Sequence, residues 1–462
     1  MTSVIVSFDT EDFVTPESDD ALGRLCDALT SRGICGCFDL VGDKVRGLRQ
    51  RGRQDVITRV LSHEIDYHSN DHHFFPLLAP TIEGKPWDES LAWVLEHEAR
   101  GVAELEETFG RRPVAWVKTD SHWTPQSLQA FRLLGMRVYG CRHFDAGSPR
   151  LWWYMNLLTI PWLGSFEHYI QREGTPRDLL KAELADFEVK AEAAGPDGVL
   201  NYGTHPCMWS CSVFYDIHNV KRRGHPPPKH KWQPAPLLPD WRIKRDRQFL
   251  LMFLDELKRQ GVEFINCGQL HERYAEPPNR WLTQAQLGSL ARPMTTRFAA
   301  AKAGGGYYNV AEVLAALCYA LARYRESGTL PARVPVRQPI GPVETPRTMK
   351  KPLEVCGRAL LGAARRADDC FRERGRVPAG VDVGGHHFPP AQLLRAAAEN
   401  YLAILAGKRP PGAVLQPGPD CPEEATLLEG ARIGAYALPT DYHPAGLLEL
   451  GRLQSWTLKP AV

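Results

Sequence analysis

The protein has 462 residues, more than one ordinary hydrophobic core accommodates, so two or three domains are expected. An apolar content of 43% with 24% charged residues excludes an intrinsically disordered chain. The net charge of +2 gives no strong field for nucleic acid or an anionic membrane, and no run approaches the about 18 apolar residues that a membrane-spanning helix needs.

The N-terminal sequence and the cysteine pattern favour a cytoplasmic protein. The opening sequence MTSVIVSFDTEDF has no basic region, no long apolar run and no small-residue cleavage site, so a signal peptide is not expected. The eleven cysteines are scattered and form no CxxC pair, which favours reduced thiols. We therefore expect a cytoplasmic protein in which any metal site is built from histidine and carboxylate, not from cysteine.

Short apolar strands alternate with amphipathic helices as far as about residue 275. Strands are predicted over 3–8, 34–42, 64–68, 113–120, 136–140 and 198–206, and helices over 18–33, 54–63, 88–110 and 124–135. Ser18 is the predicted N-cap of the first helix, and residues 245–270 add a helix, a glycine stop and a last strand. This alternation predicts a parallel sheet with helices outside it, as a barrel or as an open sheet.

The composition changes after residue 275. Residues 276–306 read as an irregular linker, and residues 337–352 as a Pro-rich connector. Segments 307–334 and 386–414 resemble each other: each has an aromatic start, an Ala/Leu-rich helix, and then Gly and Pro. We therefore predict three parts, with residues 1–275 as the catalytic domain, 276–306 as a linker, and 307–462 as a small helical C-terminal module with two related halves.

Polar side chains follow several of the predicted strands. In α/β folds the carboxyl ends of parallel strands meet in one crevice, so these side chains are expected to converge. They are Asp9, Glu11, Asp12, His68, His72, Lys118, Asp120, His122, Trp123 and His205. Two histidines with a carboxylate and an open position form the ligand set of a catalytic divalent metal. A further carboxylate can act as general base and a further histidine as general acid.

The order and spacing of these motifs resemble the polysaccharide deacetylase (NodB-homology) family of carbohydrate esterases. SFDTED stands where the family has an acidic Thr-Phe-Asp-Asp-Gly motif, SHEIDYHSNDH matches its His-Ser/Thr-x-x-His motif, and VLNYGTHP matches a late Leu-x-His motif. The resemblance covers roughly residues 3–275. It implies a distorted (β/α) barrel, here followed by a small helical domain.

The resemblance also implies a chemistry, namely metal-dependent hydrolysis of a non-peptide amide bond. The expected reaction is de-N-acetylation of a carbohydrate or glycoconjugate, with zinc as the expected ion. His68 and His72 would be ligands together with Glu11 or Asp12; a related Asp-x-Asp/Glu pattern favours Glu11. Asp9 would be the general base, and His205 would protonate the leaving amine.

The third motif departs from the family pattern. In WVKTDSHW, Lys118 stands where the family has Arg and Asp120 where it has Pro. Lys118 is still expected near the catalytic centre, although a lysine orients a carboxylate less well than the planar arginine does. His122, Trp123 and Tyr202 are expected to bind substrate. The long, basic, Pro-rich segment 214–236 reads either as a lid over the site or as a solvated excursion.

Two other functions stay open at this level. One is a hydrolase of the same fold that acts on a small cyclic amide or ureide, which a closed pocket would favour. The other is a non-catalytic carbohydrate- or cell-wall-binding protein. The C-terminal region loosely resembles pseudomurein-binding-type repeats, which implies cell-wall contact; capping of the catalytic domain or formation of a homodimer is the alternative. No nucleic-acid partner is expected.

Overall fold

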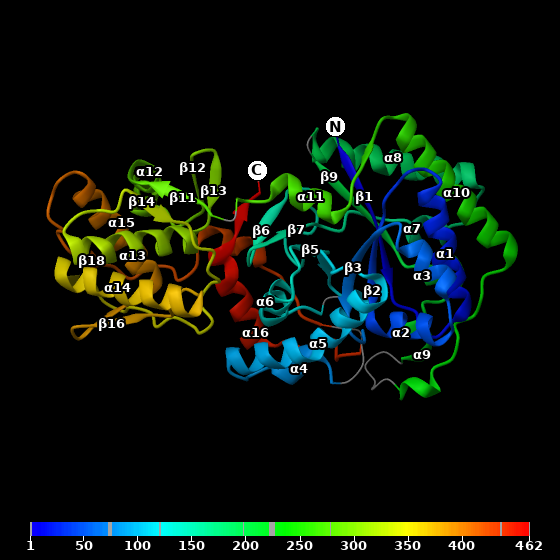
Figure 1. The fold of residues 1–462 in the computed structure, drawn as a ribbon, viewed down its shortest axis with the longest axis horizontal. Helices are drawn as coiled ribbons and strands as arrows, with labels where there is room; N and C mark the ends of the chain where they lie inside the picture. The colour runs from blue at the N-terminus through cyan, green and yellow to red at the C-terminus, as the bar shows by residue number, and fades with distance from the viewer. Residues whose placement is uncertain are drawn as a thin grey trace. The chain divides into compact units, whose positions relative to one another are not determined.

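The structure is a computed structural model that describes residues 2–72, 76–119, 122–196, 198–220, 227–277, 279–434 and 437–461. The chain divides into two compact units, and each is described by itself. Unit 1 comprises residues 1–151, 157–273 and 432–444, and unit 2 comprises residues 152–156, 274–431 and 445–462. Figure 1 shows the ribbon of both units, with helices and strands labelled where there is room.

Unit 1 is built on a parallel sheet. Its strands are β1 (Ser3–Thr10), β2 (Cys37–Val41), β3 (Glu64–Ser69), β4 (Ala115–Val117), β5 (Val138–Gly140), β7 (Leu157–Thr159), β8 (Gly164–Ser165), β9 (Val199–Thr204) and β10 (Glu263–Phe264). They lie in the order β7-β5-β4-β3-β2-β1-β9-β8, with β10 also beside β1, and these pairings are parallel. β1 is buried along its whole length, as its continuous β-branched run predicts.

Helices connect these strands and pack around them (Figure 1). They are α1 (Pro16–Thr30), α2 (Gly42–Gln50), α3 (Gln54–Val60), α4 (Leu78–Ile82), α5 (Trp87–Phe109), α6 (Pro125–Leu133), α7 (Glu167–Ile170), α8 (Pro176–Ala194), α9 (Tyr215–Asn219), α10 (Asp240–Arg259) and α11 (Cys267–Tyr274), with 3-10 turns η1 (Pro206–Trp209) and η2 (Lys229–Lys231). The α/β class and the parallel sheet are thus confirmed, and the fold is barrel-like.

The first helix begins earlier than predicted. Thr15, not Ser18, is the N-cap residue, and Pro16 occupies the first helical turn. Proline fits there because its missing N–H is one of the donors that a helix start leaves unpaired. Ser18 lies inside the helix and donates its hydroxyl hydrogen to the Asp12 carbonyl oxygen, 3.0 Å away. The prediction for Ser18 is therefore wrong.

Unit 2 contains one structural motif twice. The first copy runs β11 (Trp281–Thr283), α12 (Gln284–Met294), β12 (Ala301–Ala303), β13 (Gly306–Tyr308), α13 (Val310–Ser327) and β14 (Arg333–Pro335). The second runs β15 (Leu353–Val355), α14 (Gly357–Arg374), β16 (Val381–Val383), β17 (His386–Phe388), α15 (Pro390–Leu405) and β18 (Ala413–Leu415). In each copy the outer strands pair antiparallel and the two middle strands form a hairpin.

The four repeat helices enclose the apolar core of unit 2, together with α16 (Ala445–Leu453) and η4 (Gln454–Thr457). Short strands β6 (Trp152–Tyr154) and β19 (Lys459–Pro460) pair antiparallel, and η3 (Glu423–Leu428) completes the unit. Residues 276–306 are not irregular as predicted, because β11, α12 and β12 lie there. The division into residues 1–275, 276–306 and 307–462 otherwise stays a prediction.

No helix in the described part of the chain is both long enough and apolar enough to cross a membrane.

Candidate functional site: a carboxylate and two histidines in a cavity

Glu11, His68 and His72 meet beside the carboxyl ends of β1 and β3. Glu11 Oε1 lies 2.9 Å from His68 Nε2 and 3.1 Å from His72 Nε2, and all three side chains are buried. His72 adopts a left-handed backbone with φ of 52°, a conformation that few non-glycine residues adopt and that recurs at functional sites. The local backbone thus turns this ring back toward Glu11.

These three donors fit a divalent ion. Bonds of about 2.1 Å to His nitrogen and carboxylate oxygen place the ligand atoms about 3.0–3.4 Å apart in octahedral or tetrahedral geometry. The measured separations of 2.9 and 3.1 Å are close to that range. Glu11 Oε2 is buried and has no hydrogen-bond partner in the described part of the chain, so it too is available to an ion.

Asp9 and His205 lie next to this group. His205 Nε2 is 3.7 Å from Asp9 Oδ2 and 3.7 Å from Glu11 Oε1. Asp9 belongs to β1, and His205 directly follows β9, its neighbour in the sheet. Parallel pairing of the two strands therefore brings a carboxylate and an imidazole to the same edge, as predicted from their positions after the strands.

Two acidic residues that were missed in the sequence hold the histidines in place. His72 Nδ1 donates to Asp216 Oδ2 on α9 at 3.1 Å, and His205 Nδ1 donates to Glu167 Oε1 on α7 at 2.5 Å. The same Glu167 oxygen accepts from the backbone N–H of His205 at 2.8 Å. Carboxylates in this role fix the tautomer of a functional histidine. No local pattern marks either acid, because each lies dozens of residues from its partner.

The pKa values of His205 and His72 lie well above the usual value of an imidazole. Burial opposes protonation of His205, but Glu167 and Glu11 outweigh it and raise the His205 pKa to about 10. Burial also opposes protonation of His72, and the Glu11 and Asp216 carboxylates raise its pKa to about 10. A protonated His205 is the state that a proton donor requires.

The carboxylates are shifted in opposite directions. Burial raises the Asp9 pKa above its usual value, although His68 and His205 act against it. Burial also acts to raise the Glu11 pKa, but His72 and the His68 hydrogen bond prevail and hold it well below its usual value. Glu11 is thus an anion suited to a cation, whereas Asp9 more readily takes up a proton, as a general base must.

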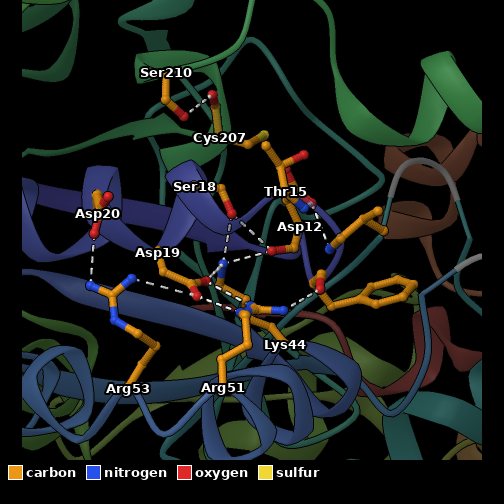
Figure 2. A network of polar contacts seen from close by, with 12 residues as sticks. Asp12, Thr15, Ser18, Asp19, Asp20, Lys44, Arg51, Arg53, Cys207 and Ser210 are labelled. Atoms are coloured by element: carbon orange, nitrogen blue, oxygen red, sulfur yellow. Dashed lines mark hydrogen bonds and ion pairs between the residues drawn. The ribbon is translucent and has the colours of Figure 1, made fainter. Parts of the chain in front are cut away.

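Asp12 stabilises the loop between β1 and α1 and does not contact the histidine cluster. Its Oδ1 accepts from the backbone N–H groups of Val14 and Thr15, each at 2.9 Å. Figure 2 shows the network around it: the buried Lys44 ammonium donates to the Asp12 carbonyl at 2.6 Å and to Asp19 at 2.7 Å. The structure therefore brings Glu11, and not Asp12, to the histidines.

The three predicted substrate-binding residues do not line the cavity of the candidate site. His122 is buried and its Nε2 accepts from the Ala79 N–H at 3.1 Å. Trp123 is 1% exposed and donates to the Arg432 carbonyl at 2.8 Å, and Tyr202 is fully buried among core aromatic rings. Their predicted role in substrate binding has no support in the lining of the cavity, because packing has placed these rings inside the unit.

Lys118 is half-buried at the end of β4. Burial raises the pKa of the Cys141 thiol well above its usual value, the Asp9 carboxylate adds to that rise, and the Lys118 ammonium opposes it. Lys118 and Asp9 thus both act on Cys141, and the role of Lys118 at the catalytic centre stays a prediction. Asp120 and residues 221–226 of the predicted lid lie outside the described residues.

A cavity of about 730 Å³ opens onto the reactive groups. Asp9, Glu11, His72 and His205 contribute to its wall. Its remaining lining residues are Glu167, Ile170, Gln171, Met208, Cys211, Ser212, Val213, Phe214, Ile217, Leu238, Arg242 and Asp246. Segment 211–217 forms one wall, so the described start of the predicted lid does border the site.

Comparison with solved structures finds neighbours among carbohydrate esterases and an allantoinase. A CE4 family pseudoenzyme from Bacillus anthracis is 13% identical with a TM-score of 0.33, over 58% of this chain and 64% of its own, so the chain spans just under two thirds of that neighbour. PuuE allantoinase is 14% identical with a TM-score of 0.39, over 59% of this chain and 89% of its own. A family 4 acetyl xylan esterase from Clostridium thermocellum, in complex with a cobalt ion, is 16% identical with a TM-score of 0.33, over 60% and 93%. The sequence matches no protein-family model and no curated protein.

Proposed function

We propose that the protein is a metal-dependent hydrolase of a carbon–nitrogen amide bond that removes an N-acetyl group from a carbohydrate or glycoconjugate. One observation carries the proposal: Glu11, His68 and His72 form a buried ligand set, and Asp9 and His205 stand beside it in one cavity. This is the complement of groups that amide hydrolysis at neutral pH requires.

Glu11, His68 and His72 would hold the divalent ion, with zinc the expected ion. When bound, such an ion polarises the amide carbonyl and lowers the pKa of water. Asp9 would accept the proton of the attacking water, for which its raised pKa suits it. His205, kept protonated by Glu167, would deliver a proton to the departing amine nitrogen, which is otherwise a very poor leaving group.

The cavity supports a glycan or glycoconjugate over a small cyclic amide. Its volume of about 730 Å³ lies in the upper part of the about 300–1,000 Å³ typical of ligand pockets. Ile170, Met208, Val213 and Phe214 supply apolar wall, and Gln171 and Arg242 supply polar groups. A substrate with hydroxyl groups and an apolar face matches this mixture, whereas a small ring leaves much of the space unfilled.

Metal content and turnover, measured on the same purified samples, test the proposal. Wild type, Asp9→Asn and His68→Ala would be assayed against N-acetylated sugars and cyclic amides, with His271→Ala as a control outside the cavity. We expect Asp9→Asn to keep the metal but lose about 10²–10⁴-fold in kcat. We expect His68→Ala to bind one metal ion per chain fewer than wild type, and His271→Ala to match wild type. A wild type that binds no metal after reloading contradicts the mechanism.

A further inference from the structure

Four metal-binding side chains meet at the opposite end of strands β2 and β3 from the candidate active site. Cys37 and Glu64 are the first residues of β2 and β3 and are partners in register, Asp66 lies two residues further along β3, and Cys267 begins α11. One ligand atom from each residue lies within 4.8 Å of the other three. Cys37 Sγ is 3.8 Å from Cys267 Sγ and 3.3 Å from Glu64 Oε1.

These separations match the edges of a tetrahedral zinc site. With Zn–S bonds of about 2.3 Å and Zn–O bonds of about 2.1 Å, tetrahedral geometry places two sulfurs about 3.8 Å apart and sulfur and oxygen about 3.6 Å apart. The Cys37–Cys267 separation equals the first value, and the Cys37–Glu64 separation is within a few tenths of an ångström of the second. Side-chain adjustments of that size suffice to close the site.

An unpartnered buried oxygen points to a cation here. Asp66 is fully buried; its Oδ1 accepts from the Ala115 N–H at 2.8 Å, whereas Oδ2 receives no N–H donor among the described residues and its carboxyl group faces that of Glu64. Two buried carboxyl groups that face each other need a proton or a cation between them, and a divalent ion supplies the charge that lets both bind as carboxylates.

Backbone N–H groups hold the two carboxylate ligands in place through hydrogen bonds. The Gly268 N–H donates to both Glu64 carboxylate oxygens, at 2.9 and 3.2 Å, and the Ala115 N–H holds Asp66. Such outer contacts orient ligands before an ion arrives. Cys37 and Cys267 are 230 residues apart in the chain, so no local cysteine spacing indicates this cluster, which is why the sequence favours histidine and carboxylate ligands alone.

We propose that Cys37, Glu64, Asp66 and Cys267 bind a structural Zn²⁺ that ties α11 to strands β2 and β3. Two thiolates select zinc over magnesium or calcium, which prefer oxygen ligands alone. Four protein ligands leave no position for substrate, so the ion stabilises the fold and takes no part in catalysis. This proposal does not depend on the proposed function.

Metal analysis of the full chain separates this site from the candidate active site. The double variant His68→Ala/His72→Ala should retain one zinc per chain, and adding Cys37→Ser should remove it. Adding Cys26→Ser instead is the matched control, because Cys26 is an equally buried thiol outside the cluster. The proposal is overturned if the double variant binds no zinc after reconstitution, or if the zinc persists when Cys37→Ser is added. If the proposed function fails and this site is real, wild type itself holds one zinc.

Cobalt substitution gives a readout that does not involve activity. Co²⁺ bound by thiolates shows a near-ultraviolet charge-transfer band, which an active site of nitrogen and oxygen ligands lacks. We expect the band in wild type and in His68→Ala/His72→Ala, and its loss in Cys37→Ser. If the cysteine variants do not fold, a thiol-reactive mercurial added to wild type should release the zinc. A Cys37–Cys267 disulfide found by mass spectrometry in freshly purified, metal-loaded protein contradicts the proposal.

Discussion

At the scale of single residues, the carboxylates behind the histidines matter as much as the predicted ligands. Asp216 accepts the Nδ1 hydrogen of His72, which leaves Nε2 directed at Glu11. We expect Asp216→Asn to weaken metal binding about 10–100-fold, because the amide no longer anchors the imidazole in that tautomer. Competition with a chromogenic chelator measures the affinity. Asp255→Asn, which removes an exposed carboxylate on α10, serves as the control, and equal affinities in both variants contradict this role.

Glu167 sets the protonation state of His205. The folded protein holds the His205 pKa at about 10, so the ring is protonated at neutral pH and loses its proton as the pH rises through that value. Without the Glu167 carboxylate the pKa must fall toward its ordinary value. We expect Glu167→Gln to move the alkaline limb of kcat/KM to lower pH by about one unit or more. A pH–rate profile whose alkaline limb stays in place indicates that His205 is not the proton donor.

At the scale of elements, a buried ion pair fixes the loop that carries Glu11. Lys44 on α2 is 1% exposed and donates to Asp19 on α1, to Ser18 and to the Asp12 carbonyl (Figure 2). Lys44→Met leaves Asp19 buried with Arg51 as its main remaining cation. We expect a loss of about 2 kcal/mol in the free energy of unfolding.

The matched control for this change lies on the same helix. Arg49 forms an exposed pair with Glu107, so Arg49→Met should alter stability by less than about 0.5 kcal/mol. Urea unfolding of both variants gives the comparison. Because the loop also positions Glu11, Lys44→Met should reduce metal retention as well. Equal stabilities of the two variants contradict the structural role of the buried pair.

At the scale of the whole molecule, the two units do not follow one another along the chain. Residues 432–444 belong to unit 1, although they come after most of unit 2. The Arg432 carbonyl accepts from the Trp123 indole at 2.8 Å, and Leu438 packs against Leu77. A fragment of residues 1–275, the predicted catalytic domain, lacks these contacts.

We therefore expect the 1–275 fragment to have a melting temperature well below that of unit 1 in the full chain. Exposure of the apolar surface around Leu77 and Trp123 is the physical reason. Differential scanning calorimetry of the fragment and the full chain makes the comparison. Adding a synthetic peptide of residues 432–444 should raise the melting temperature of the fragment. A fragment as stable as unit 1 in the full chain shows that the late segment is dispensable.

The predicted elements and the observed ones agree where the signal is local. The apolar run of β1, the periodicity of α5 and its closing Gly110 in a left-handed conformation all depend on neighbouring residues. The early start of α1 at Pro16 and the helix α12 within the predicted linker were not recognised. At the start of α1, Pro16 hid a weak helical pattern from the prediction. In α12, a mixture of small and polar residues did the same.

The sequence by itself determined an α/β alternation and placed Asp9, His68, His72 and His205 at or just beyond the carboxyl ends of strands, because periodicity and strand ends are properties of adjacent residues. Only the tertiary structure decided that Glu11 rather than Asp12 faces the histidines, since that choice depends on how the buried Lys44 holds the loop.

Three further features depended on the folded structure. They are the carboxylate partners Glu167 and Asp216, the contact between Cys37 and Cys267, and the place of residues 432–444 in unit 1. Each of these contacts joins residues far apart in the chain. Distant segments are brought together by burial of apolar surface and by strand pairing across the whole unit. A short stretch of sequence therefore does not predict which distant residues come into contact.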